Sequence, residues 1–393
     1  MIKAKTILVC GFLLASLLVF ARDLDEYALE IAQHNPEVQA TKSNYVSQME
    51  GYRTENMLGG PEVDFGYKFG PDGRESNRWG LSVGQSFDFP GVYRARSKAN
   101  GYRAEAFENL YRGALLKSAL EAKQLLIKTV AARQKVDILA AADANVQCLS
   151  DYYRRAYSLG ETTMLEIKKI ELERFDISMR YSRAQAELEG YMSTLKSMSG
   201  SDAEPELPTE LPLPLLGAYN DYVEAFTVND PTVAANGNMY EVASADVSVS
   251  KLAALPSFKL SYTHDYEDMR HFNGFSIGIE LPAWTRRHSV KAAEALVAAH
   301  SFDEYSMRRR AEIAGEYALA TRLAARIENA RIVFESEDYT QLLDKALDGG
   351  RISIFEYLRE YNDYLDARAE YVELRGELAL ALASLNRYKL LER

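Results

Sequence analysis

Cysteine is nearly absent from the 393-residue sequence, which contains only Cys10 and Cys148. Cys10 lies in a segment that we expect to be removed, so the mature chain would hold one thiol and no internal disulfide. Long apolar runs are scarce as well. The run over residues 7–20 is shorter than the roughly 20 residues that a spanning helix requires, so we expect no transmembrane helix.

This N-terminal apolar run has the features of an export signal. Lys3 and Lys5 precede it, and the small residue Ala21 follows it. We therefore predict a signal peptide over residues 1–21 and an exported mature chain. The alternative is an N-terminal anchor that is never cleaved.

Patterns of nucleic-acid binding and catalysis are also missing. The net charge of -11 and the pI near 5.2 argue against a nucleic-acid partner. The sequence has no nucleophile elbow, phosphate loop or HExxH motif, so we expect neither an enzyme nor a cofactor. The five histidines are scattered. His264 and His271 could meet near a hairpin, but no cysteine pattern stands beside them, so we expect no metal site. The five are His34, His264, His271, His288 and His300.

Proline is absent from two long stretches, residues 91–204 and 283–393. They predict very long helices, on the order of 100 Å for residues 92–158 at about 1.5 Å per residue. Two apolar seams with a spacing of seven follow the helix after residue 164, on separate flanks, which indicates a neighbour on each side. A buried helix in a large bundle is the alternative. One seam is Leu165, Leu172, Met179 and Ala186, and the other is Ile170, Ile177, Ala184 and Tyr191.

The chain is a tandem repeat. Residues 27–38 match residues 222–233, each ending in Pro-x-Val, at an offset of about 195 residues. We expect a first repeat over residues 22–204, a proline-rich linker over 205–216 and a second repeat over 217–393. Each repeat would hold a helix (residues 24–58 and 219–255), two short strands and a long helical hairpin.

A glycine marks the tip of each expected helical hairpin. Leu159-Gly160 and Gly349-Gly350 suit the left-handed position that ends a helix. Thr163-x-x-Glu166 and Ser353-x-x-Glu356 then have the spacing of capping boxes, which start the next helix.

The four expected strands cover residues 61–70, 79–89, 256–266 and 272–282, and each alternates apolar with small or charged residues. Strands of about ten residues with this alternation and with aromatic ends are typical of transmembrane barrels. A soluble sandwich is the alternative. The fold class is therefore α+β membrane protein. Four strands cannot close a barrel, so two, three or four chains must associate. The expected lipid-facing residues are Phe65, Tyr67, Leu81, Val83, Leu260, Tyr262, Phe275 and Ile277.

These tandem halves resemble the TolC-type outer-membrane efflux family over essentially all of the mature chain. The resemblance rests on the opening helix with Asn35-Pro36-Glu37-Val38, the Gly-Leu-Ser-Val-type strands and the glycine-plus-hydroxyl tips. The compact length, Leu281-Pro282 and the later Arg286-Arg287 look most like the branch that serves heavy-metal pumps.

The resemblance implies a homotrimer in the outer membrane of a Gram-negative bacterium. Three chains would form a twelve-strand β-barrel continuous with a periplasmic α-barrel of coiled-coil helices. The tips would meet a periplasmic adaptor protein bound to an inner-membrane pump, and small molecules or metal ions would pass passively. The alternatives are the outer-membrane component of a one-step protein secretion system and a periplasmic coiled-coil scaffold.

Channels of this family often narrow at the periplasmic tip, with carboxylates just after the second hairpin turn. By position, Glu356 matches the first acid, and three copies would form a cation-binding ring. Arg359 replaces the second acid and Glu360 follows it, while Glu166 is the equivalent of Glu356 in the first hairpin. Capping alone is the alternative role of Glu356 and Glu166.

The hairpin tips are the expected adaptor contacts, and plain tight turns are the alternative. The tip residues are Leu159, Gly160, Thr162, Thr163, Gly349, Gly350, Arg351 and Ser353.

Overall fold

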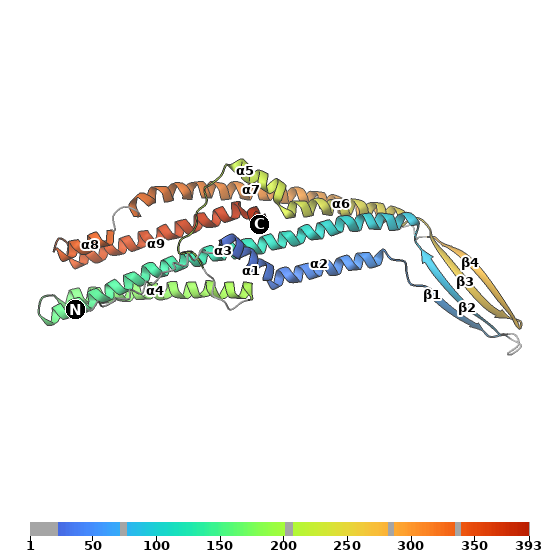
Figure 1. Cartoon of the computed structure of the whole chain (residues 1–393), viewed down its shortest axis with the longest axis horizontal. Coiled ribbons are helices and arrows are strands. Elements are labelled where there is room, and N and C mark those ends of the chain that lie inside the picture. The colour runs from blue at the N-terminus through green and yellow to red at the C-terminus, as the bar shows by residue number, and fades with distance from the viewer. Residues whose placement is uncertain (1–22, 71–76, 201–206, 282–286, 335–338, 393) are drawn as a thin grey trace, which may run out of the picture.

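The computed structural model of the chain describes residues 23–70, 77–200, 207–281, 287–334 and 339–392. The expected signal peptide lies outside these residues. Figure 1 shows an elongated molecule with a four-stranded sheet at one end and the tips of two helical hairpins at the other. The short helices α1 and α5 and the C-terminus lie midway between the two ends.

Long helices connect the sheet to the tips. Helix α3 (Pro90–Ser158) has 69 residues and is followed by α4 (Met164–Ser199). In the second half, α7 (Arg287–Phe334) precedes α8 (Tyr339–Asp348) and α9 (Ile354–Leu385). At about 1.5 Å per residue, α3 alone extends on the order of 100 Å. Pro90 occupies its first turn, where a missing N–H costs nothing.

The opening helix of each half is divided in two, which differs from our expectation of continuous helices over residues 24–58 and 219–255. The first half has α1 (Leu24–His34) and α2 (Pro36–Glu55), and the second has α5 (Tyr219–Asn229) and α6 (Pro231–Leu252). In both, a proline blocks continuation, and the preceding Asn35 or Asp230 caps the new helix with its side chain.

The four strands form one antiparallel sheet in the order β1-β2-β3-β4. They are β1 (Glu62–Lys68), β2 (Arg78–Phe87), β3 (Ser257–Glu267) and β4 (Arg270–Glu280). The turn between β3 and β4 is shorter than the loop expected over residues 267–271. It has two residues, Asp268 and Met269, both with positive φ (47° and 61°). Such a turn matches the twist of the paired strands.

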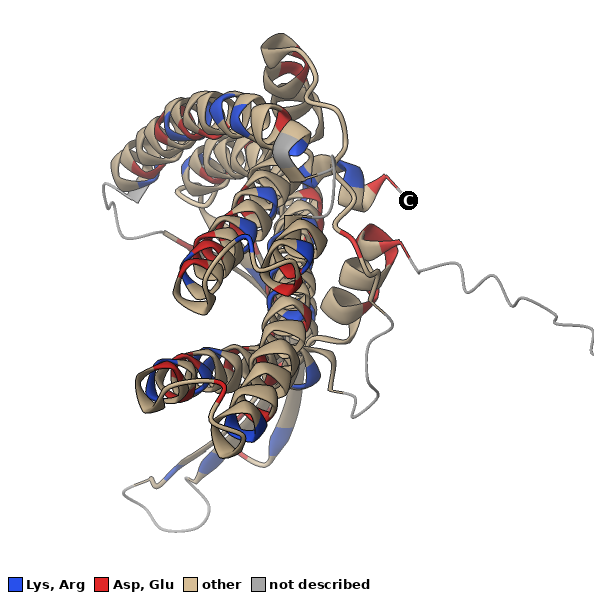
Figure 2. Ribbon diagram, turned by 90° about the vertical axis from the view of Figure 1, so that its left-hand side faces the viewer, with Lys and Arg blue, Asp and Glu red and all other residues tan. Residues whose placement is uncertain are grey.

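The main apolar core lies midway along the molecule, where residues from α1, α3, α5, α7, α9 and the C-terminal 3-10 helix (Arg387–Leu391) pack together. Seen from the tips in Figure 2, the helices lie along an arc, with acidic and basic residues along their length. Across the part of the chain that the structure describes, no helix has the length and apolarity needed to cross a membrane.

Candidate channel sheet and helical tip

One face of the sheet is apolar and open to solvent in the single chain. All eight residues expected to face lipid are exposed, with relative exposures from 38% for Leu81 to 82% for Phe275. The register places them in cross-strand pairs, such as Phe65 with Leu81 and Tyr262 with Phe275. An apolar face of this extent requires a covering phase or partner.

A row of rings crosses this apolar face near the β3–β4 turn. Tyr67 pairs with Trp79, Trp79 with Tyr266, and Tyr266 with His271. The rings of Trp79 and Tyr266 are stacked with centroids 6.0 Å apart. Amphipathic rings at one level are typical of a membrane–water interface. Phe272, another of the aromatic residues at the strand ends, instead pairs with Asp265 on the opposite face, because strand residues alternate in direction.

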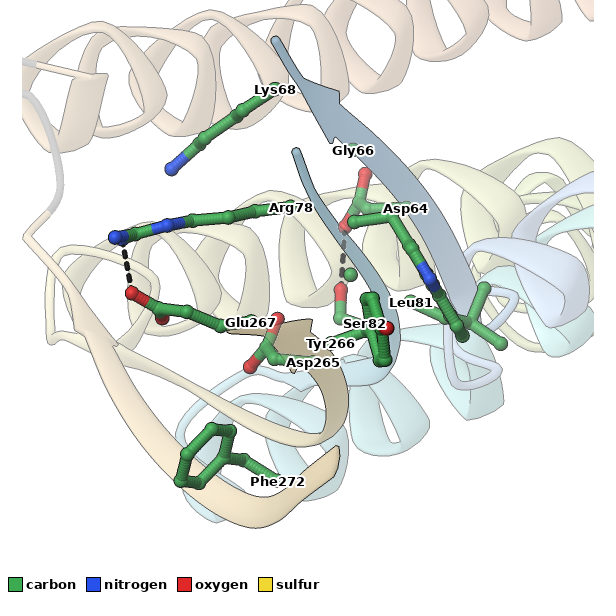
Figure 3. Close-up of a pocket in the computed structure, with 12 residues that line it drawn as sticks. Asp64, Gly66, Lys68, Arg78, Leu81, Ser82, Asp265, Tyr266, Glu267 and Phe272 are labelled. Atoms are coloured by element: carbon green, nitrogen blue, oxygen red, sulfur yellow. Dashed lines mark hydrogen bonds and ion pairs between the residues drawn. The ribbon is translucent and has the colours of Figure 1, made fainter. Parts of the chain in front are cut away.

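The opposite face of the sheet is polar and hollowed. A hollow of about 420 Å³ lies on this face and is lined by charged residues from three strands. Figure 3 shows these side chains, which are Asp64, Lys68, Arg78, Asp265 and Glu267. Arg78 forms an ion pair with Glu267 from β3. Charged groups therefore gather on one face of the same strands whose other face is apolar.

Both hairpin tips have the geometry that their sequences predict. Gly160 and Gly350 adopt φ values of 79° and 62°. The capping boxes are complete, since Thr163 and Glu166 bond each other's backbone N–H, as do Ser353 and Glu356. Most tip residues expected to contact an adaptor are exposed, while Thr162 is half-buried and donates its hydroxyl to Glu166 at 2.5 Å.

These hydrogen bonds lower the pKa of both capping acids. For Glu166 the main cause is the hydroxyl of Thr162, and for Glu356 it is the backbone N–H of Ser353. A carboxyl group whose pKa is lower in the folded state stabilises the fold above its unfolded pKa, and this contribution is lost as the pH falls through the folded value. The caps should therefore weaken below about pH 4.5, the ordinary pKa of a glutamate.

We expect amide protection at residues 163–170 and 353–360 to fall as the pH is lowered below about 4.5, after correction for intrinsic exchange rates. Hydrogen exchange read by mass spectrometry measures this. In Thr163→Ala and Ser353→Ala, the corresponding tip should be less protected already at neutral pH and should change less with pH. Protection that is independent of pH in the natural chain would contradict the role of the charged acids.

Arg359 and Glu360, the other gate candidates, bind each other. Arg359 Nη2 lies 2.8 Å from Glu360 Oε1. Glu360 also accepts a hydrogen bond of 3.3 Å from the hydroxyl of Tyr339 on α8. The Arg359 guanidinium is the main reason that the pKa of Glu360 is lowered. The four gate candidates therefore divide into two capping acids and one ion pair at the tips.

Tyr357 is a tip residue that sequence reasoning missed. Its side chain is buried, and its hydroxyl donates to Asp344 of α8 at 2.8 Å and accepts from Asn145 of α3 at 2.9 Å. The ring packs in an apolar cluster with Ile170 of α4. Tyr357 therefore joins the two hairpins close to their tips. Its sequence signal is slight, because a tyrosine within an apolar seam has the pattern of any core residue.

The two seams of α4 have different surroundings. Ile170 and Ile177 are buried against the rest of the chain, whereas Leu165 and Leu172 are 71% and 67% exposed. One flank of α4 therefore has its neighbour within the chain, and the other has none among the described residues.

The sequence matches no protein-family model and no curated protein. Its structure, however, resembles solved outer-membrane channels. CusC is 15% identical with a TM-score of 0.75, and the alignment covers 93% of this chain and 91% of CusC. The CmeC outer membrane channel of Campylobacter jejuni is 13% identical with a TM-score of 0.72, covering 93% of this chain and 85% of CmeC.

The outer membrane protein VceC of Vibrio cholerae gives a similar result. It is 15% identical with a TM-score of 0.73, and the alignment covers 93% of this chain and 95% of VceC. At these identities the likeness shows the fold. The expected resemblance to TolC-type channels is confirmed at that level.

Proposed function

We propose that this protein is the outer-membrane channel of a tripartite efflux system. Three copies would assemble into a twelve-strand β-barrel and a periplasmic α-barrel. The tips would contact a periplasmic adaptor protein bound to an inner-membrane pump. Small molecules or metal ions would then leave passively through the pore, driven by that pump.

The sheet carries this proposal. Its apolar face is exposed, its other face is charged, and β1 and β4 leave two open edges. In lipid an open edge leaves backbone groups without partners, so the strands must close with those of other copies. Closure would place the apolar face toward lipid and would make the hollow with Asp64 and Arg78 part of the pore wall.

The exposed seam of α4 supports association of the helices as well. Leu165, Leu172 and Met179 recur every seven residues and are open to solvent in the single chain. Such a seam buries itself against a second helix in a coiled coil. A neighbouring copy supplies that helix in the proposed trimer.

The proposed gate lies at the tips, where the second hairpin is acidic. Six acidic and three basic residues lie between Tyr339 and Asp366, a net charge of -3 per chain. Three copies around one axis would repel anions and attract cations. We assign Glu356 and its counterpart in the first hairpin, Glu166, to the acidic part of the gate and the Arg359–Glu360 pair to its closed arrangement.

Single-channel recording in planar bilayers tests the proposal. The purified mature chain should form trimeric, cation-preferring pores. Their conductance should rise in Glu356→Gln and Arg359→Ala, because these variants weaken the helix cap and the ion pair that would hold the tip in its narrow arrangement. Glu370→Gln is the matched control, since this exposed acid lies on the same helix about 21 Å further along.

The outcomes separate the candidate functions. A folded monomer that neither inserts nor conducts would contradict the channel and favour the periplasmic scaffold. A pore that responds equally to Glu356→Gln and Glu370→Gln would keep the channel and overturn the gate at the tip.

A further inference from the structure

Two histidines that are seven residues apart meet on the apolar face of the sheet. His264 of β3 and His271 of β4 are diagonal neighbours beside the two-residue turn, because His264 pairs with Asn273 and His271 pairs with Tyr266. His264 Nε2 lies 3.2 Å from His271 Nδ1. We propose that this pair binds a divalent transition-metal ion, which would clamp the β3–β4 hairpin next to its turn.

Hydrogen bonding around His264 presents one nitrogen as a ligand. The hydroxyl of Tyr262 lies 2.7 Å from Asn273 Oδ1, and His264 Nδ1 lies 2.7 Å from the same oxygen. The oxygen can only accept, so Nδ1 of His264 carries the proton and Nε2 keeps its lone pair, directed at His271. A hydrogen bond of this kind on the far nitrogen is the usual means by which proteins orient a ligating imidazole.

The separation of the two nitrogens suits a shared ion. Imidazole nitrogens bind Zn²⁺ at about 2.0–2.1 Å, so two of them on one ion lie roughly 2.9 Å apart at a right angle and roughly 3.4 Å apart at a tetrahedral angle. The observed 3.2 Å falls between these values. Without metal, a proton on His271 Nδ1 would fill the same gap as a hydrogen bond. A metal ion would take the place of that proton, so that His271 Nδ1 becomes a ligand. The proton would then move to Nε2 of His271 or be released to water.

The residues around the pair favour a divalent ion from the end of the first transition series, with water molecules in the coordination positions that the two histidines leave open. Imidazole ligands suit Cu²⁺, Ni²⁺ and Zn²⁺ rather than Ca²⁺ or Mg²⁺. His271 is exposed, which leaves room for water on the ion. The ring of Trp79 packs beside both imidazoles, with centroids 5.5 Å and 6.4 Å away, and so restricts their rotation. No group of three or more His, Cys, Asp or Glu suited to a metal occurs among the described residues, so the site is a two-residue one.

Copper titration followed by electron paramagnetic resonance tests the site. The full-length protein is purified in detergent without a histidine tag, and Cu²⁺ is the probe. We expect one Cu²⁺ per chain with hyperfine coupling to two imidazole nitrogens. His264→Ala and His271→Ala should each lose that equivalent, while His300→Ala, an exposed histidine on α7, should keep it. Asn273→Ala should weaken binding roughly tenfold, because the orienting hydrogen bond is lost.

Two results would overturn the site. One is the absence of a two-nitrogen copper signal in the natural chain, and the other is a signal that survives in His264→Ala. If an alanine variant misfolds, His271→Gln and the nitrogen count of the natural chain still decide the question. Binding is measured in detergent, so a channel that fails to conduct leaves the result unaffected, and a missing copper signal leaves the channel unaffected.

Discussion

Replacing Asp230 with alanine is expected to destabilise the protein by roughly 3–5 kcal/mol. Asp230 is 4% exposed, and its carboxylate accepts four hydrogen bonds. Oδ1 caps α6 through the backbone N–H groups of Thr232 and Val233, while Oδ2 accepts from the hydroxyls of Tyr305 and Tyr388, each at 2.9 Å. Alanine removes the cap and leaves two tyrosine hydroxyls without this acceptor.

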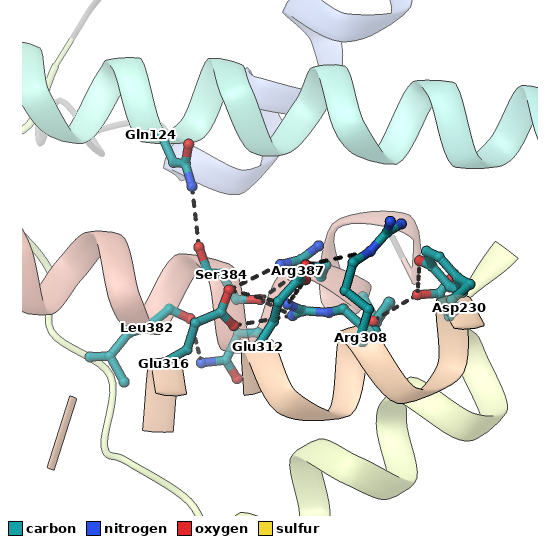
Figure 4. A network of polar contacts seen from close by, with 12 residues as sticks. Gln124, Asp230, Arg308, Glu312, Glu316, Leu382, Ser384 and Arg387 are labelled. Atoms are coloured by element: carbon teal, nitrogen blue, oxygen red, sulfur yellow. Dashed lines mark hydrogen bonds and ion pairs between the residues drawn. The ribbon is translucent and has the colours of Figure 1, made fainter. Parts of the chain in front are cut away.

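The four bonds join separate parts of the chain around the middle of the molecule. Figure 4 shows Asp230 at one end of a polar network that continues through Glu316 and Arg387 to Ser384. Arg309 of α7, which is only 2% exposed, belongs to the same network through its bonds to Glu316. Loss of Asp230 therefore weakens the attachment of α6 and of the C-terminal segment to α7.

Urea denaturation of the detergent-solubilised protein measures this effect. Asp230→Asn is the matched control, because its side-chain oxygen can still cap α6, and it should lose less than half as much stability. Asp221→Ala offers a second comparison, since the carboxylate of this exposed residue accepts a hydrogen bond from the backbone N–H of Ala218 at the start of α5, whereas Tyr305 and Tyr388 donate to Asp230. Equal midpoints for Asp230→Ala and the natural chain would contradict the structural role of the carboxylate.

Removing the hydroxyl of Tyr357 should open the proposed gate. Tyr357→Phe keeps the buried ring but breaks the bonds to Asn145 and Asp344 that join the hairpins. Each copy loses about 1 kcal/mol of this link. If three copies open together, the equilibrium shifts by about 3 kcal/mol, or roughly a hundredfold toward the open state.

Single-channel recording of Tyr357→Phe gives the open fraction directly. Tyr364→Phe is the matched control, because Tyr364 lies on the same helix two turns further along and contacts Phe334 and Tyr339 through its ring. The ratio of open to closed channels should therefore be roughly a hundredfold higher in Tyr357→Phe than in Tyr364→Phe. An unchanged open fraction in a folded Tyr357→Phe trimer would show that the hairpins separate elsewhere.

Sequence patterns that extend over many residues were enough to predict the arrangement of helices and strands in the single chain. The missing prolines predicted the length of α3, and the glycine-plus-cap motifs predicted both tips. The division of the opening helices was not predicted, because a helical pattern continues on both sides of Asn35-Pro36 and the proline stands in the first turn of the second helix, a position that suits it. The turn at Asp268 and Met269 was missed because neither residue is a glycine, the usual sign of positive φ.

The candidate site was predicted in part, for a physical reason. Alternation along a strand assigns residues to a face, so the exposed apolar residues could be named in advance. Pairing between helices depends on registers that a single sequence does not contain, so Tyr357 and its partner Asn145 were not found. That His264 and His271 could meet near a hairpin was visible in the sequence, but their direct contact depends on the register across the β3–β4 turn.

Because α3 is one unbroken helix, the direction in which its tip faces is fixed relative to the sheet at its other end. Val92, Ala99 and Ala106 are buried at intervals of seven residues. The same side of the helix therefore packs against the neighbouring helices from the sheet onward. One inserted residue would rotate the part of α3 beyond it by about 100° about the helix axis and shift it by about 1.5 Å along that axis. The tip of the hairpin would then face away from the helices it packs against. Seven inserted residues would turn it by only about 20°. Natural insertions or deletions in α3 should therefore have lengths that are multiples of seven residues.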